Sequence, residues 1–114
     1  MERRSNMYYT YMIRCKDNSI YTGITTDLER RINEHITKDK KCAKYTYFHI
    51  ATKLETAWIS EDRKTASKLE YWIKHLNKNQ KEELIKNNYK LAILLKDKID
   101  TSLYKNINEK SKKE

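Results

Sequence analysis

Two runs rich in β-branched and aromatic residues, joined by only three residues, constrain the fold more than any other feature of the chain. The first run is YYTYMIRC (8–15), the joining segment is KDN (16–18), and the second run is SIYTGI (19–24). Such runs are typical of strands, and Asn18 tolerates the left-handed conformation that closes a three-residue loop. The sequence therefore predicts an antiparallel hairpin in which Cys15 pairs with Ser19.

The length of this loop decides which side chains share a face of the hairpin. Tyr11 and Tyr21 have the same sequence parity, so a three-residue loop places both on one face, whereas a two-residue loop would separate them. Gly23, the single glycine among 114 residues, lies in the second strand. We expect its missing side chain to leave the sheet open to a substrate backbone, although a bulge or turn explains it equally well.

A helix, a basic loop and a third strand are expected after the hairpin. Thr26 and Glu29 form a capping-box pattern, and apolar residues at helical spacing predict a helix over about 27–38. The segment 37–53 carries five lysines against one aspartate and has no clear period, so it is expected to be a loop. LETAWIS (54–60) alternates like a strand.

The remainder of the chain is expected to be helical. Ser60 is a candidate cap for a helix whose apolar face has the members Ala66, Leu69, Ile73 and Leu76. Asn77 with Gln80 predicts a fresh cap for a short helix over 78–87, and a helix is expected over 89–100. The order β-β-α-β-α-α predicts a small α+β sandwich, with a three-stranded antiparallel sheet flanked by helices.

Length and composition limit the class of protein. A chain of this length forms one domain, which we expect over 7–90, after a disordered lead at 1–6 and before a helical extension with a frayed basic tail at 91–114. The net charge of +9 makes polyanions the natural partners. Two widely spaced cysteines and no secretory segment indicate reduced thiols in a cytoplasmic protein, and no apolar run is long enough for a membrane span.

Polar residues beside the predicted sheet are candidates for chemistry. Arg31 and His35 are four residues apart, so both lie on one side of the first helix, close to the end of the glycine-bearing strand. Glu70 is a lone carboxylate beside the apolar face of the second long helix. If both helices pack on the same sheet, these groups can join Tyr11 and Tyr21.

Each candidate also has an ordinary structural explanation. Tyrosines on strands usually pack in the half-buried surface, and a helical histidine usually lies on the surface. Arg31 could simply pair with Glu34 or Asp27, and Glu70 could pair with Lys74 four residues later. Only several such features occurring together favour an active site.

Three blocks in order resemble one known family. YYTYMIRC, YTGITTDLERRINEH and SKLEYWIKHL, spanning about residues 7–90, resemble the GIY-YIG nuclease domain, and in particular its small stand-alone bacterial branch, UPF0213-like and related to the Slx-type nucleases. The segments 9–11 and 21–23 stand for the two signature tripeptides. Tyr9 replaces the first glycine, and threonine replaces isoleucine in both tripeptides.

The resemblance implies a divalent-metal-dependent endonuclease that hydrolyses DNA, including branched, flapped or nicked DNA in repair or recombination. Arg31 matches the catalytic arginine, His35 matches a histidine found in several branches, and Glu70 matches the glutamate that binds Mg²⁺ or Mn²⁺. Tyr11 is the favoured general base, with Tyr21 orienting the water or phosphate. The sequence does not separate those two assignments.

The basic segment is expected to bind the DNA backbone without reading sequence. Its candidate contacts are Lys40, Lys41 and Lys44, beside Gly23 in the strand. AKYT (43–46) resembles a loop of the stand-alone branch. Two other functions stay open: a nucleic-acid-binding module without useful turnover, and a nuclease subunit that needs a targeting protein partner.

Overall fold

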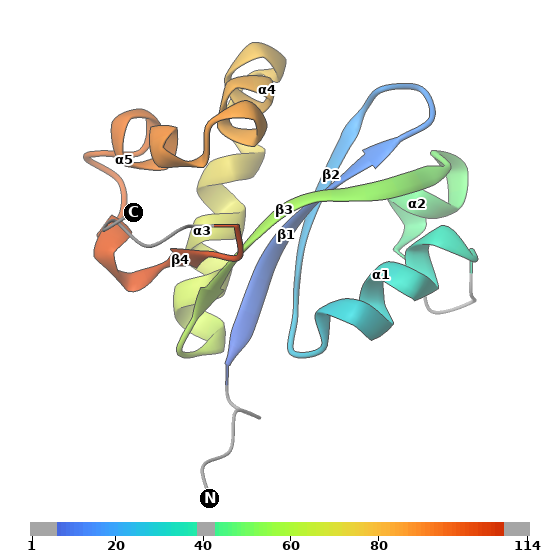
Figure 1. Ribbon diagram of the computed structural model, residues 1–114, viewed down its shortest axis with the longest axis horizontal. Helices are drawn as coiled ribbons and strands as arrows, with labels where there is room; N and C mark the ends of the chain where they lie inside the picture. The colour runs from blue at the N-terminus through green and yellow to red at the C-terminus, as the bar shows by residue number, and fades with distance from the viewer. Residues whose placement is uncertain (1–6, 39–42, 109–114) are drawn as a thin grey trace, which may run out of the picture.

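The computed structural model describes residues 7–38 and 43–108 (Figure 1). Within these residues the chain forms an antiparallel sheet in the order β2-β1-β3-β4. The strands are β1 (Tyr8–Cys15), β2 (Ile20–Thr25), β3 (Ala51–Ser60) and β4 (Lys105–Asn106). The predicted α+β fold is confirmed, and the sheet has one more strand than the sequence indicated.

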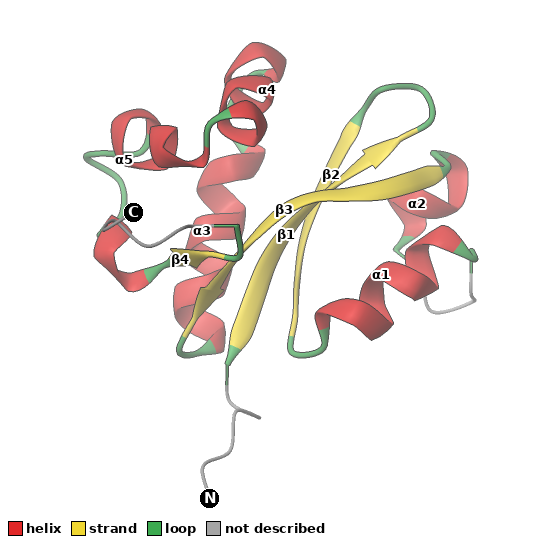
Figure 2. Cartoon of the chain, viewed as in Figure 1, coloured by secondary structure: helices red, strands yellow, loops and turns green. Residues whose placement is uncertain are grey.

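Helices cover both faces of the sheet. Figure 2 shows α1 (Leu28–Ile36) and α2 (Lys44–Phe48) on one side. On the other side lie α3 (Arg63–Lys74), α4 (Lys78–Lys86) and α5 (Leu91–Leu94). Two short 3₁₀ turns, Asn88–Lys90 and Thr101–Leu103, connect the last elements. No helix of the described residues is both long and apolar enough to cross a membrane.

The hairpin has the predicted loop and register. The Cys15 amide donates to the Ser19 carbonyl at 2.9 Å, and Asn18 has a φ of 72° in the left-handed region. Along the two strands Tyr11 pairs with Gly23. Tyr11 and Tyr21 consequently lie on the same face, beside α1.

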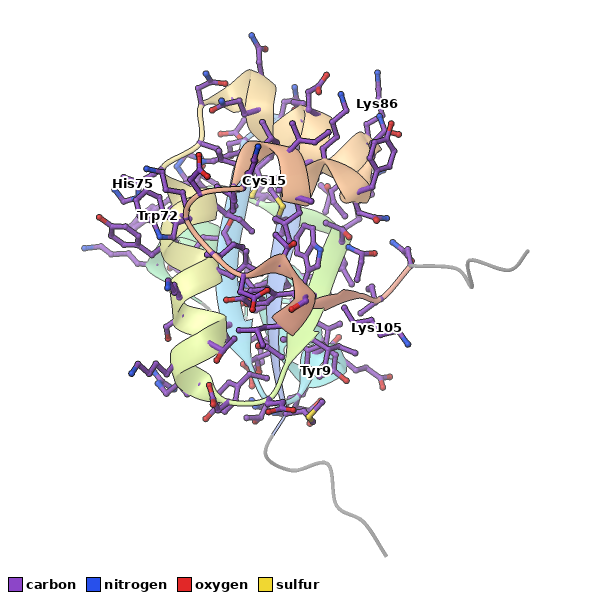
Figure 3. The ribbon with its side chains drawn as sticks, turned by 90° about the vertical axis from the view of Figure 1, so that its left-hand side faces the viewer. Tyr9, Cys15, Trp72, His75, Lys86 and Lys105 are labelled. Carbon is purple, nitrogen blue, oxygen red and sulfur yellow. The ribbon has the colours of Figure 1, made fainter. Side chains whose placement is uncertain are left out.

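Each face of the sheet has its own core. Tyr11, Ile13 and Ala57 are buried on one face, against α1 and α2. The opposite core is larger and consists of Met12, Ile20, Trp58, Leu69, Ile73, Leu84, Leu91, Leu95, Ile99 and Tyr104. Its last members show that residues 91–104 return to cover the sheet. On α3, Trp72 is partly buried and packs against this larger core, whereas His75 at the end of the helix is exposed (Figure 3).

Two predicted helix caps are wrong by one or two residues, and one is right. Asp27, not Thr26, caps α1, because its carboxylate accepts the Arg30 amide at 3.1 Å. Asp62, not Ser60, caps α3 in the same way, with the Thr65 amide at 2.8 Å. A carboxylate at a helix N-terminus also complements the helix dipole. The capping box of Asn77 and Gln80 at α4 is confirmed.

Three further boundaries differ from the prediction. The basic segment is not all loop, because it contains α2 and the start of β3 at Ala51. The helix expected over 27–38 ends at Ile36, and the helix expected over 89–100 stops at Leu94. The short α2 and β4 have no periodicity that a sequence pattern could show. Lys40, Lys41 and Cys42 lie outside the described residues, as do 1–6 and 109–114.

Candidate active site

Gly23 makes room for the side chain of Tyr11. A Cβ atom at position 23 would lie 2.6 Å from the Tyr11 hydroxyl oxygen and 2.8 Å from Cζ of the same ring. The φ angle of Gly23 is not positive, and the β1–β2 register runs through it without a shift. The glycine is thus required for space rather than for a bulge or turn. The expected opening for a substrate backbone is filled by the phenol.

The phenol leads to a buried chain of polar groups. The Tyr11 hydroxyl oxygen and His35 Nε2 share a hydrogen bond of 2.9 Å. The second ring nitrogen of His35, Nδ1, shares one of 2.6 Å with Thr46 Oγ1. All three side chains are at most 1% exposed. His35 is therefore not the surface histidine that its helical position would suggest.

Arg31 stands beside the same phenol. Its positive charge acts to lower the pKa of the Tyr11 phenol, and its Nη1 donates to Glu34 Oε1 at 2.7 Å. The ion pair of Arg31 with Glu34, which the sequence offered as an ordinary structural role, is present. Arg31 nevertheless lies close to Tyr11. Glu34 also accepts from Arg30 at 2.8 Å. This pairing holds Arg31 on the side of α1 that faces Tyr11.

Tyr21 completes an aromatic wall around His35. Its ring centroid lies 6.2 Å from that of Tyr11 and 5.3 Å from that of His35. On its other side it stacks on Tyr45 of α2, at 5.6 Å. Lys74 Nζ lies 5.7 Å from the centre of the Tyr21 ring, so α3 reaches this site past the edge strand β2.

Glu70 arrives from the opposite side of the sheet. It lies on α3, pairs with Lys74 at 3.1 Å, and its charge is felt by both Tyr11 and Tyr21. The sequence suggested that Arg31, His35 and Glu70 can join the two tyrosines if both helices pack on the same sheet. Instead the tyrosines, Arg31 and His35 lie on the α1 face, and Glu70 approaches them at the edge of β2.

The comparison with known proteins gives the family. The GIY-YIG catalytic domain matches residues 7–91. The chain belongs to the GIY-YIG family. This is a nuclease family, and the match covers every candidate catalytic residue named above.

Two relatives are similar to this chain over most of their length. A UPF0213 protein of Halalkalibacterium halodurans is 41% identical over 78 residues, which cover 68% of this chain and 81% of that protein. A UPF0213 protein of Fusobacterium nucleatum is 44% identical over 78 residues, covering 68% of this chain and 76% of that protein. The solution NMR structure of the UPF0213 protein BH0048 from Bacillus halodurans has a TM-score of 0.46 and 40% identity, and covers 70% of this chain and 83% of that one.

The protonation states in this GIY-YIG site follow from its burial. Burial raises the pKa of Tyr11 well above its ordinary value, and the neighbouring Tyr21 adds to the effect, while Arg31 opposes it. Burial also lowers the pKa of His35 from 6.5 to about 4, reinforced by the positive charge of Arg31. At neutral pH the pair is therefore a neutral phenol bonded to a neutral imidazole.

Glu70 fits a hydrated divalent cation better than a closed protein cage. The described residues contain no group of three or more His, Cys, Asp or Glu side chains that could hold a metal ion. Mg²⁺ commonly keeps several waters and takes only one or two carboxylates, with phosphate oxygens as further ligands. The Glu70 side chain is 23% exposed, so a cation and a phosphate can reach it.

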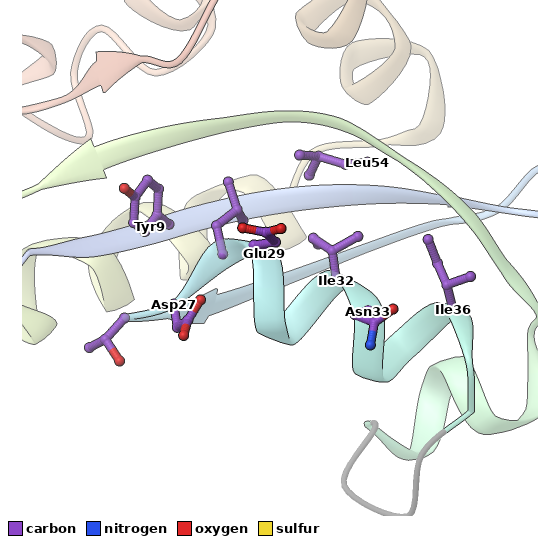
Figure 4. Close-up of a pocket in the computed structure, with 9 residues that line it drawn as sticks. Tyr9, Asp27, Glu29, Ile32, Asn33, Ile36 and Leu54 are labelled. Atoms are coloured by element: carbon purple, nitrogen blue, oxygen red, sulfur yellow. The ribbon is translucent and has the colours of Figure 1, made fainter.

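A cavity of about 900 Å³ lies between α1 and strands β1 and β3, away from this chemistry (Figure 4). Its lining includes Tyr9, Leu28, Ile32, Ile36 and Leu54. None of the five candidate catalytic residues lines it. Size alone therefore does not mark the reactive part of the surface.

One expected DNA contact and one unforeseen residue lie on α2. Lys44 begins this helix and is exposed. Thr46 is buried behind His35, and the sequence reading did not single it out. The resemblance at AKYT pointed to this segment, but only the folded structure shows the hydrogen bond between Thr46 and His35.

Proposed function

We propose that the chain is a divalent-metal-dependent endonuclease that hydrolyses phosphodiester bonds in DNA. The observation that carries this proposal is the buried Tyr11–His35 hydrogen bond, with Arg31 beside it. A phenol that is already paired with an imidazole can exchange protons without solvent. Membership of the GIY-YIG nuclease family supports the same reaction class.

Tyr11 is the general base, with His35 behind it. A phenolate would be scarce at neutral pH, because the pKa of Tyr11 is raised by its burial. The water proton therefore passes to the Tyr11 oxygen as the Tyr11 proton passes to His35 Nε2, 2.9 Å away. The water oxygen forms a bond to phosphorus, and the bond from phosphorus to the 3′ oxygen breaks. The departing 3′ oxygen takes a proton from solvent water, so the products are a 5′-phosphate and a 3′-hydroxyl.

The other residues bind and orient the phosphate. Arg31 donates to the non-bridging phosphate oxygens, where negative charge grows in the transition state. Tyr21 orients the water or the phosphate from the neighbouring strand. Glu70 holds Mg²⁺ or Mn²⁺, which supplies Lewis-acid charge for the departing oxygen when it is bound.

The substrate and its delivery are a second part of the proposal. The resemblance to Slx-type nucleases supports branched, flapped and nicked DNA as the substrates to test first. Lys44, together with Lys40 and Lys41, is proposed to bind the phosphate backbone beside the site. A targeting protein partner would select the DNA if the chain binds it without cutting.

The test compares two substitutions that separate catalysis from binding. Glu70→Gln removes the charge that retains the cation but keeps the side-chain volume, so cleavage should fall by about 100-fold or more while affinity for DNA without metal holds. Arg31→Ala should lose cleavage and affinity together, because arginine also meets the phosphate before reaction. Glu61→Gln, an exposed carboxylate ahead of α3, is the matched control. Wild-type cleavage by Glu70→Gln protein would leave Glu70 as only a partner of Lys74.

A further inference from the structure

We infer that Thr46 is a positioning residue, which fixes His35 in the tautomer whose Nε2 is free to take the proton of Tyr11. The inference rests on the proposed function, because it gives the Tyr11–His35 hydrogen bond the direction that the reaction needs. The donors and acceptors around Tyr11 and His35 determine which of their atoms carry hydrogen.

The direction begins at Arg31. The positive charge of the Arg31 guanidinium attracts the negative end of the phenol dipole, so the Tyr11 oxygen faces Arg31 and the phenol proton points away from it. The phenol has one proton of its own, and His35 Nε2 lies 2.9 Å from the phenol oxygen. Tyr11 therefore donates to Nε2, and Nε2 carries no hydrogen.

The direction continues through the imidazole into α2. A neutral imidazole with a bare Nε2 has its hydrogen on Nδ1, which then donates to Thr46 Oγ1 at 2.6 Å. The Thr46 hydroxyl in turn donates to the Ala43 carbonyl at 3.2 Å. Each proton in this series of hydrogen bonds thus has one acceptor, and every donor lies on the Tyr11 side of its acceptor.

The opposite order would disable the base. If Thr46 donated to Nδ1, the hydrogen of His35 would lie on Nε2 and point at the Tyr11 oxygen, which already faces the positive charge of Arg31. The Tyr11 proton would then have to turn toward the substrate, and the oxygen could not receive a proton from water. Thr46 prevents this because its hydroxyl already donates to the Ala43 carbonyl at the start of α2, and so has no hydrogen left for Nδ1.

Burial makes the choice of tautomer firm. His35 and Thr46 are both 0% exposed, so solvent does not compete for Nδ1. A buried N–H without a partner is costly, because it has lost its hydrogen bonds to water and gained none in return. The hydroxyl of Thr46 therefore has a chemical role that a methyl group of equal size cannot fill.

The test pairs Thr46→Val with Thr46→Ser. Valine keeps the shape and removes the hydroxyl, whereas serine keeps the hydroxyl. Nitrogen-15 NMR of the imidazoles reports the tautomer directly, with His35→Gln protein used to assign the resonances. We expect the wild type and Thr46→Ser to carry hydrogen on Nδ1, and Thr46→Val to gain the Nε2–H form.

Single-turnover cleavage should follow the tautomer. Thr46→Val should cut about 10- to 100-fold more slowly, by analogy with the loss of the outer hydrogen-bond partner of a metal-bound histidine, and Thr46→Ser should recover most of the rate. A wild-type spectrum with hydrogen on Nε2 overturns the inference, even if Thr46→Val does not fold. An unchanged tautomer and rate in folded Thr46→Val also overturns it. The expected tautomers in a wild type that cuts no DNA would instead contradict the proposed function.

Discussion

Gly23→Ala should destabilise the protein although alanine suits a strand better than glycine does. The backbone at Gly23 has no positive φ, so alanine can adopt it without strain. Replacing glycine at such a position stabilises a protein by about 0.4–1 kcal/mol, because the unfolded chain loses freedom. On backbone grounds alone the variant would therefore be the more stable protein.

The packing of Tyr11 reverses that sign. The new Cβ would lie 2.6 Å from the Tyr11 hydroxyl oxygen, 2.8 Å from Cζ, and 3.0 Å from Cε2 of Tyr21. Tyr11 is 1% exposed, so its ring cannot move out into solvent to avoid the new Cβ. Overpacking of this kind costs about 1–3 kcal/mol, and losing the bond to His35 adds about 1 kcal/mol. The net loss should be about 1–3 kcal/mol after the backbone gain.

Urea denaturation measures this loss, and Tyr11→Phe provides the matched background. Phenylalanine lacks the oxygen that is nearest to the new Cβ, so Gly23→Ala should cost less in the Tyr11→Phe protein than in the wild type. Single-turnover cleavage should fall with Gly23→Ala, since the phenol can no longer keep its place. An alanine variant as stable as the wild type, or one with equal cost in both backgrounds, would refute the explanation of Gly23.

The remaining predictions concern pH and DNA affinity. The pKa of His35 is about 4 in the folded protein and 6.5 when unfolded, so its neutral form stabilises the fold above pH 6.5, and this stability is lost as the pH falls toward 4. The free energy of unfolding, measured by urea denaturation, should fall by about 3 kcal/mol over this range. Because Glu34 and other carboxylates also titrate at low pH, the contribution of His35 is the part of this fall that is absent from the His35→Gln protein. An equal pH dependence in both proteins contradicts this origin. Separately, glutamine at three lysines should weaken binding to all DNA sequences alike and flatten its salt dependence, whereas unchanged binding would make the segment an ordinary solvated surface. The three positions are Lys40, Lys41 and Lys44.

The hairpin and the face that its tyrosines share could be predicted because both depend on local rules. A three-residue loop determines the register, and the register places Tyr11 and Tyr21 on one face. The spacing of Arg31 and His35 likewise determines their side of α1. These features follow from the periods of strands and helices, which a sequence displays directly.

The parts that could not be predicted depend on contacts between distant segments. β4 has two residues, and Asn106 within it donates to Thr56 Oγ1 at 2.8 Å, an interaction that no local pattern announces. Gly23 looked like an opening because the sequence does not show that the ring of Tyr11, its partner across the hairpin, lies over it. Thr46 lies in a five-residue helix inside a basic segment, too short for a period.

The cap of α1 was predicted wrongly for a more local reason. Thr26 and Asp27 are adjacent, and each can accept a hydrogen bond at a helix start. The glutamate three residues after Thr26 favoured the threonine, but the helix begins at Leu28 and the aspartate accepts the Arg30 amide. A one-residue change in the start leaves the apolar face of α1 unchanged, so the candidate site survived the error.

Metal-dependent cleavage by the wild-type protein tests the proposed reaction most directly. End-labelled single-stranded, flapped, nicked and junction DNA would be incubated with excess protein in Mg²⁺, Mn²⁺ or EDTA, and the product ends would be mapped. We expect cutting of at least one substrate with either metal, none in EDTA, and products with a 5′-phosphate and a 3′-hydroxyl. Binding without cutting of any of these substrates, or equal cutting in EDTA, would contradict a metal-dependent nuclease built on Tyr11, His35 and Glu70.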